Sequence, residues 1–227
     1  MDYQRNLLYF TGEDNLSGCI MAAICVFAFV VAIKAGNTAM LAVSAVLFVI
    51  GVIQGWGEKK WPVSDADYDA LIESYTASLK SLALDKLGVD ESEVNEVTPI
   101  ILGGYEFDGV ETVKQGSDSK WRSNIYKVVM LFFSRNELHC YTMRFNTLRD
   151  EKTEGTDVFF YQDIVSASTS SLTFKVNADG KEITINPEAF KLTTKGGTSF
   201  TVNILNAQQA HESVNAMRAL LREKKQA

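Results

Sequence analysis

The sequence predicts an α+β protein in which a two-helix transmembrane hairpin and an amphipathic linker helix precede an antiparallel β domain that ends in a helix. Three observations lead to this fold class. An almost uninterrupted apolar run occupies residues 18–54, apolar residues recur at helical spacing after Pro62, and apolar and polar residues alternate between turn signals from about Glu96. We therefore divide the chain into an N-terminal segment with the hairpin (1–57), the linker helix (58–93) and the β domain with its closing helix (94–227).

The apolar run has the length and the polarity of two membrane-crossing helices. Its halves, residues 18–33 and 39–54, each approach the ~17–20 residues that an α-helix needs to cross a hydrocarbon core of about 30 Å. Apart from cysteine thiols, Lys34 in the turn is the only ionisable side chain of the run, so neither half has a polar face. Small residues recur four positions apart in each half, and we consider both a packing face in lipid and chance composition for them. They are Ala28, Ala32, Gly51 and Gly55.

The basic residues around the apolar run predict its orientation. Arg5, Lys59 and Lys60 lie on the side of the two termini, whereas the turn carries Lys34 alone. Because basic segments stay in the cytoplasm, we expect an integral protein of the cell membrane with both termini and the β domain on the cytoplasmic side. The run contains no Asp, Glu, Arg or His, so a transport pathway has no side chain to carry a proton or an ion.

Composition and charge narrow the function. The net charge of −6 divides into −1 before Glu58, from three acidic and two basic residues, and −5 from Glu58 onward, and an acidic domain argues against a nucleic-acid partner. Three cysteines and two isolated histidines have neither disulfide nor metal-ligand spacing, so we expect no metal and no cofactor. Because we find no catalytic constellation and no phosphate-binding glycine loop, we expect neither an enzyme nor a small-molecule substrate.

The linker segment has the signals of one amphipathic helix. Ser64 is a suitable N-cap, and Gly88 is a suitable stop. Two interpretations are open for its apolar stripe: packing on the β domain that follows, or a coiled coil that pairs two protomers. The stripe residues that we consider as a protein interface are Tyr68, Leu71, Tyr75, Leu79 and Leu82.

From about Glu96 the period-two pattern predicts a series of antiparallel strands. We expect strands at Val97–Phe107, with a bulge at Gly103-Gly104, and at Trp121–Phe133, Leu138–Leu148, Thr156–Val165, Leu172–Val176, Lys181–Ile185, Phe190–Thr194 and Thr198–Leu205. A last helix should begin after the N-cap Asn206. Its apolar face consists of Ala210, Val214, Met217, Leu220 and Leu221.

The β domain resembles a pleckstrin-homology-like (PH-like) domain of the kind found in bacterial membrane proteins. The features that carry the resemblance are the number of strands, the long second and third strands, the step Tyr161-Gln-Asp-Ile-Val-Ser166 and the closing helix. It covers about residues 94–225. The resemblance implies two nearly orthogonal sheets in a partial barrel, with the C-terminal helix plugging one open end. A closed lipocalin-like barrel would need longer and more regular strands.

In eukaryotic members of that family a lysine, a variable loop and a Lys/Arg-x-Arg motif grip inositol phosphates. Lys114, Lys120 and Arg122 match that spacing, so the resemblance implies a contact with anionic lipid headgroups. Three acidic residues in the same loop, Asp108, Glu111 and Asp118, oppose this contact, and so does the acidic charge of the domain. An ordinary solvated loop is the alternative interpretation.

These observations predict a membrane-anchored interaction or scaffolding module that presents its cytoplasmic domain to a protein partner, or to a second copy, rather than to lipid. Two alternatives stay open. One is an oligomeric membrane effector or pore-forming subunit with the β domain as its sensor, and the other is an accessory subunit of a membrane complex. The docking surface is expected on an open strand edge of the barrel or on the stripe of the linker helix.

Overall fold

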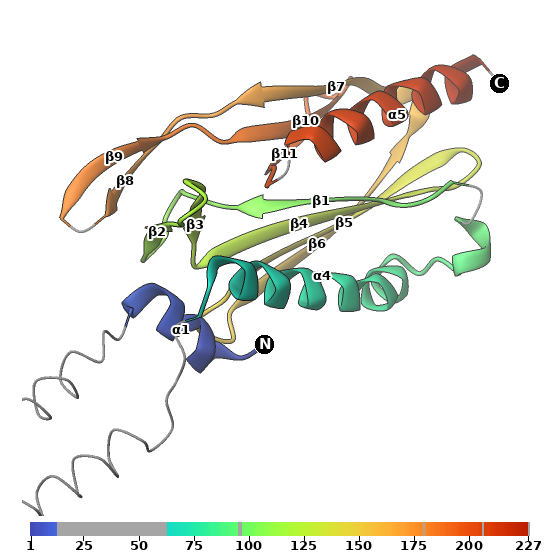
Figure 1. Ribbon diagram of the computed structural model, residues 1–227. Coiled ribbons are helices and arrows are strands. Elements are labelled where there is room, and N and C mark those ends of the chain that lie inside the picture. The colour runs from blue at the N-terminus through green and yellow to red at the C-terminus, as the bar shows by residue number, and fades with distance from the viewer. Residues whose placement is uncertain (13–62, 95–96, 179, 206, 227) are drawn as a thin grey trace, which may run out of the picture. The chain divides into compact units, whose positions relative to one another are not determined.

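The computed structural model describes residues 1–12, 63–94, 97–178, 180–205 and 207–226 (Figure 1). The helices are α1 (Tyr3–Thr11), α4 (Asp65–Leu87) and α5 (Ala207–Gln226), with the short 3-10 helices η1 (Glu91–Glu93) and η2 (Tyr161–Asp163). The strands are β1 (Ile100–Tyr105), β2 (Val113–Gln115), β3 (Trp121–Ser123), β4 (Ile125–Phe133), β5 (Glu137–Asn146), β6 (Lys152–Phe160), β7 (Ile164–Ser171), β8 (Phe174–Ala178), β9 (Lys181–Ile185), β10 (Glu188–Thr194) and β11 (Ser199–Asn203). The predicted α+β content with antiparallel sheets is confirmed.

The predicted transmembrane hairpin is not supported. Within the part of the chain that the structure describes, no helix combines the length and the apolar character needed to cross a membrane. The longest of these helices, α4, carries five acidic and two lysine side chains. We therefore withdraw the hairpin and, with it, the expected location in the cell membrane. The apolar run at 18–54, with Ala28, Ala32, Gly51 and Gly55, lies outside the described residues.

The chain divides into two units, residues 1–10 with 64–227 and residues 11–63. Two antiparallel sheets form the centre of the first unit, with strand orders β1-β4-β5-β6 and β11-β10-β7, and two hairpins, β2-β3 and β8-β9, extend from them. Helix α4 covers one face of the first sheet, whereas α5 and the second sheet lie on the other face (Figure 1). Strand β4 has covered faces on both sides, and eight of its nine side chains are buried.

The core lies between the first sheet, the second sheet and α5. Alternate side chains of β4 and β5 enter it, among them Leu131, Phe133 and Leu138, because successive residues of a strand point to opposite faces. Val214, Met217 and Leu221 of α5 are buried there, as the predicted apolar face requires, and Leu220 packs at the margin. Asn206 and the side chain of Ala210 lie outside the description.

Helix α4 begins and ends where the sequence predicts. The Ser64 hydroxyl accepts a hydrogen bond from the Asp67 N–H, and the Asp67 carboxylate accepts one from the Ser64 N–H, which makes a reciprocal capping box. Gly88 ends the helix in the left-handed region at φ 65°, which glycine adopts without a Cβ penalty. Both predicted caps are confirmed.

Several strand predictions hold and others are wrong. The strand Lys181–Ile185 is confirmed with its predicted bounds. The bulge at Gly103-Gly104 is wrong, because β1 pairs with β4 without a register shift. These glycines serve close approach instead: a Cβ on Gly103 would lie 2.7 Å from the Tyr126 hydroxyl, and one on Gly104 would collide with the Asn203 carbonyl.

The predicted strand Trp121–Phe133 is divided at Asn124. The Asn124 side-chain carbonyl accepts hydrogen bonds from the N–H groups of Glu111 and Thr112, which turns the chain between β3 and β4. Strand β7 was missed because its residues after Val165 are Ser, Ala and Thr, which give no apolar alternation. Helix α1 is not among the predicted elements, because its residues were assigned only to the N-terminal segment that precedes the hairpin.

Candidate interaction site beside strand β1

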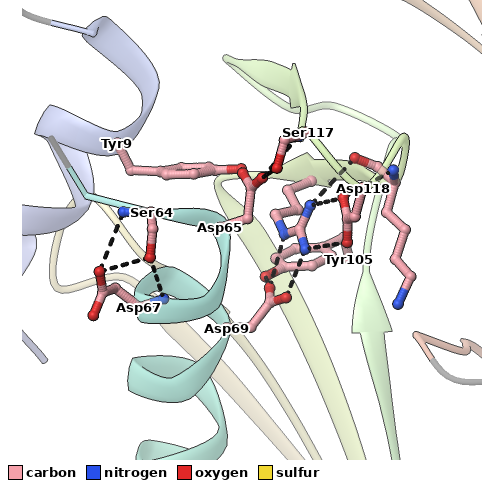
Figure 2. Close-up of polar contacts among 10 residues, drawn as sticks. Tyr9, Ser64, Asp65, Asp67, Asp69, Tyr105, Ser117 and Asp118 are labelled. Atoms are coloured by element: carbon pink, nitrogen blue, oxygen red, sulfur yellow. Dashed lines mark hydrogen bonds and ion pairs between the residues drawn. The ribbon is translucent and has the colours of Figure 1, made fainter.

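Arg122, which the resemblance implies as an anion-binding residue, is buried inside the domain and paired there with carboxylates. Arg122 is 1% exposed, and its five N–H groups are all satisfied (Figure 2). Nε and Nη2 donate to the two oxygens of Asp69 at 2.9 and 2.7 Å, and Nη1 and Nη2 donate to the two oxygens of Asp118, each at 2.9 Å. Nη1 also donates to the Lys120 carbonyl at 3.3 Å. No donor of Arg122 is left for a phosphate.

The two carboxylates and the guanidinium stabilise one another. Hydrogen bonds to Asp69 and Asp118 outweigh the burial that would lower the pKa of Arg122, and they raise it above its usual range. The hydrogen bond from Arg122 holds the pKa of Asp118 well below its usual range. Because the Tyr105 hydroxyl also donates to Asp69, at 2.6 Å, this cluster ties α4 to β1 and β3.

The other two basic residues do not join Arg122 in a binding site. The Lys114 ammonium donates to the Tyr9 carbonyl at 2.6 Å and lies 4.3 Å from the centre of the Tyr9 ring. The Lys120 side chain is exposed. Because the Lys114 ammonium is bonded to Tyr9 of α1, the three basic side chains do not point toward one common site, as the resemblance implies they would.

Helix α1 and the first turn of α4 are joined by a second set of polar contacts. Asp65 accepts hydrogen bonds from the Tyr9 hydroxyl at 2.8 Å and from the N–H and hydroxyl of Ser117, both at 2.7 Å (Figure 2). Burial alone would raise the pKa of Asp65, but these hydrogen bonds lower it. The Tyr9 ring stacks on Tyr68 with centroids 4.3 Å apart. The chain segments on either side of residues 11–63 are therefore fixed to the β2–β3 hairpin.

The predicted interface stripe of α4 is largely committed to its own domain. Tyr68 is fully buried and donates a hydrogen bond to the Ser123 carbonyl, and Leu79 is 4% exposed. Leu71, Tyr75 and Leu82 are half-buried. The stripe packs on the first sheet, which is the first of the two interpretations of this helix, so Tyr68 and Leu79 are not accessible to a partner.

Strand β1 has one edge that β4 does not use. Residues 100, 102 and 104 face β4, because the Glu106 N–H bonds to the Ile125 carbonyl and hydrogen-bonded residues alternate along an antiparallel pair. The backbone groups of Ile101, Gly103 and Tyr105 therefore point outward. The Leu205 N–H bonds to the Gly103 carbonyl at 3.0 Å, and the Asn203 side chain bonds to the Tyr105 carbonyl at 2.8 Å. No described residue bonds to the outward N–H or C=O of Ile101.

A hollow lies on each side of this open edge. The hollow toward α4, here the α4-side hollow, has a volume of about 460 Å³ and is lined by Asp69, Glu73, Ala77, Ile101, Gly103 and Lys120 among others. The hollow toward α5, here the α5-side hollow, has a volume of about 550 Å³ and is lined by Val97, Pro99, Ile101, Phe133, Ala216 and Leu220 among others. Ile101 lines both and is 38% exposed. The uncovered edge and the two hollows form the candidate interaction site.

The sequence contains one local signal for this site. Pro99 directly precedes β1, and proline in a sheet is confined to edges, strand starts and bulges because it has no N–H to donate. The hollows themselves depend on α4 and α5, which lie far away in the sequence, so no local pattern could have located them.

The side chains that the structure describes give little support for metal binding or for a cysteine nucleophile. They include no group of three or more His, Cys, Asp or Glu arranged to hold a metal ion. Burial raises the pKa of the Cys140 thiol to about 12, so this thiol is not a nucleophile near neutral pH. Comparisons with protein-family models, with curated proteins and with solved structures return no match.

Proposed function

We propose that this protein is a PH-like interaction module that binds an extended segment of a protein partner along the open edge of β1. The observation that carries the proposal is the uncovered backbone of Ile101 between two hollows. An extended peptide that adds to a strand edge gains main-chain hydrogen bonds, and pockets beside the edge select its side chains.

The arrangement of the sheets supports the PH-like part of the proposal. A four-stranded and a three-stranded antiparallel sheet pack with a C-terminal helix, and the step Tyr161–Ser166 carries the chain from β6 to β7. The Tyr161 hydroxyl donates to the Ser134 carbonyl at 2.7 Å, which fixes this step against the β4–β5 turn. The sheets meet at the contact between β1 and Leu205, and that contact ends at Gly103.

Lipid-headgroup binding is not part of the proposal. Arg122 belongs to the basic motif that implied headgroup binding, and its guanidinium is paired with Asp69 and Asp118. Breaking that buried ion pair to release the guanidinium would cost more than an exposed contact with a phosphate returns.

The test is a backbone substitution at the open edge. A displayed library of random 12-residue peptides is selected on the full-length protein, and the affinity of the selected peptides is measured on Ile101→Pro, which removes one outward N–H. Thr156→Pro, at an outward position of β6 on the opposite edge of the same sheet, is the matched control. Binding should be lost in Ile101→Pro and kept in Thr156→Pro, with the fold of both checked by circular dichroism.

Two results contradict the proposal. One is that the selected peptides bind Ile101→Pro as tightly as the parent protein. The other is that the selection yields no peptide that binds the folded parent protein.

A further inference from the structure

Building on the proposed function, we infer that the partner segment places a Lys or Arg opposite Ile101 and a bulky apolar residue next to it, opposite Ile100. This inference names the chemistry of the partner, whereas the proposed function names only the mode of binding. It follows from the side of the sheet on which each hollow lies and from the charges that line it.

The pairing of β1 decides which hollow each side chain of an added strand enters. Ile101 pairs with Met130, and the Met130 side chain lies on the face of the sheet that α4 covers. The Ile101 side chain therefore lies on the same face. Ile100 and Leu102 point to the opposite face and pack on the core beneath α5. Residues directly opposite each other in paired strands share a face. The partner residue opposite Ile101 therefore enters the α4-side hollow, and the partner residue opposite Ile100 enters the α5-side hollow. In the other direction the open edge ends at Gly103, where Leu205 is bonded.

The α4-side hollow, of about 460 Å³, has the volume for a long side chain, and its lining includes a carboxylate without an ion-pair partner among the described residues. Ala77 is a small residue of its lining, and the Tyr126 side chain lies over Gly103. Asp69 is already bonded to Arg122 and Tyr105, whereas Glu73 is exposed and has no ion-pair partner among the described residues. A lysine or arginine bridges the distance with its aliphatic stem and brings its charge to Glu73.

Lys120 lines the same hollow and opposes the binding of a basic side chain. This opposition gives a prediction of the reverse sign: neutralising Lys120 should strengthen the binding of the same peptide that neutralising Glu73 weakens. A hollow that merely accommodates any long side chain would respond to neither change.

The α5-side hollow selects for apolar side chains. Val97, Pro99, Phe133, Met217 and Leu220 line it, and Glu212 is its one charged lining residue among those described. Leu220 is half-buried, so a bulky side chain in this hollow removes apolar surface from water on both partners. Thus the neighbour of the basic residue that lies opposite Ile100 is expected to be Leu, Ile, Phe or Met.

A second copy of this chain is a poorer occupant of the same edge. Pairing of two β1 strands would place Ile100, Ile101 and Leu102 along the edge and would leave Glu73 without a cation. A partner segment with a basic residue beside an apolar one fits both hollows, whereas a second β1 strand fits only the α5-side hollow.

The experiment uses capped nine-residue peptides that are identical except at the central residue, which is Lys, Gln or Glu, with Leu on both sides of it. Fluorescence anisotropy with the full-length protein should give the order Lys, then Gln, then Glu, with about a two- to fivefold loss of affinity at each step, the scale of an exposed ion pair. Replacing both Leu residues by Ser should weaken binding at least tenfold, because the apolar side chain in the α5-side hollow loses its burial whichever way the peptide runs.

Matched variants assign each preference to its hollow. Glu73→Gln should remove the preference for Lys, whereas Asp85→Asn, which makes the same change of charge farther along α4, should keep it. Lys120→Gln should increase the affinity for the Lys peptide. Ala216→Trp should block the α5-side hollow, and Ala219→Trp, an exposed neighbour on the same helix, should not.

The outcomes separate the two claims. If the three peptides bind equally well and Glu73→Gln has no effect, the partner chemistry is wrong, while the strand-addition mode stands as long as Ile101→Pro abolishes binding. If Ile101→Pro binds like the parent, the proposed function fails first. A concentration-dependent dimer in analytical ultracentrifugation that Ile101→Pro dissociates would assign the edge to a second copy and overturn the inference.

Discussion

The first sheet has two edges, β1 and β6, and they differ in charge and in what lies beside them. All but one of the side chains of β6 are exposed, and Lys152, Glu154 and Asp157 place charge along it. Strand β1 is apolar, begins after a proline and lies between two hollows. Charged edges deter pairing with another strand. The comparison teaches that charge covers the edge at β6, whereas the edge at Ile101 is apolar and its outward backbone groups have no partner among the described residues.

Leu79→Glu is the substitution with the largest expected effect, because the open edge depends on α4 as a fixed wall. Leu79 is 4% exposed, so Leu79→Glu should lower the free energy of unfolding by about 3–5 kcal/mol, the scale for burying an unpaired charge. Leu71→Glu, at a half-buried position of the same helix, should cost about 1 kcal/mol. Urea denaturation measures both. Equal losses would mean that the stripe of α4 does not pack as a buried face.

The two edges also contain glycines in opposite surroundings. A Cβ on Gly104 would meet the Asn203 backbone, so Gly104→Ala should force the seam at β11 apart and cost about 1–3 kcal/mol. A Cβ on Gly155 of β6 would meet nothing within 4 Å, so Gly155→Ala should be neutral or stabilise by up to about 1 kcal/mol. Thermal denaturation should reveal the opposite signs. A destabilised Gly155→Ala would contradict the open surroundings of β6.

The loss of stability at low pH tests two carboxylates, Asp65 and Asp118, whose contacts help to hold α4 against the β2–β3 hairpin. The pKa values of Asp118 and Asp65 are lowered in the folded protein, so their stabilisation is complete above about pH 4, the pKa of an unfolded aspartate, and is lost as the pH falls toward the folded values. Asp118→Asn should be less stable than the parent at pH 6 and should lose less stability between pH 4 and pH 2. Parallel acid limbs for the two proteins would argue against the Arg122 ion pair.

The smallest expected effect is a change in hydrogen exchange at single backbone amides, and it tests the difference between the β1 and β6 edges directly. Hydrogen exchange should be fast at the outward amides of Ile101 and Thr156 and slow at Leu102, whose N–H faces β4. Saturation with the Lys-centred peptide should protect Ile101 and leave Thr156 unchanged. Protection of Thr156 instead would place the docking surface on β6.

Local signals in the sequence were sufficient for several elements. The caps at Ser64 and Gly88, the hairpin strand Lys181–Ile185 and the buried face of α5 were all predicted, because each depends on residues close together in the chain. Periodicity and capping act over one or two turns of backbone. The length and polarity argument for residues 18–54 is of the same local kind, yet none of the helices that the structure describes supports it.

The function of Arg122 was decided only by the fold. Its spacing from Lys114 and Lys120 suggested an anion site, but Asp69, 53 positions earlier, occupies the guanidinium instead. Sequence spacing reports which charges are neighbours along one strand, and it contains no information about which carboxylate a distant helix brings to the same place.

The open edge of β1 also depends on the tertiary structure. The sequence shows a strand with two glycines after a proline, but the seam with β11 ends at Gly103 because the chain leaves Leu205 for α5. The hollows beside Ile101 then arise from α4 on one face and α5 on the other. An edge becomes a binding site through what packs beside it, and packing between elements so far apart in the chain is a property of the tertiary structure alone.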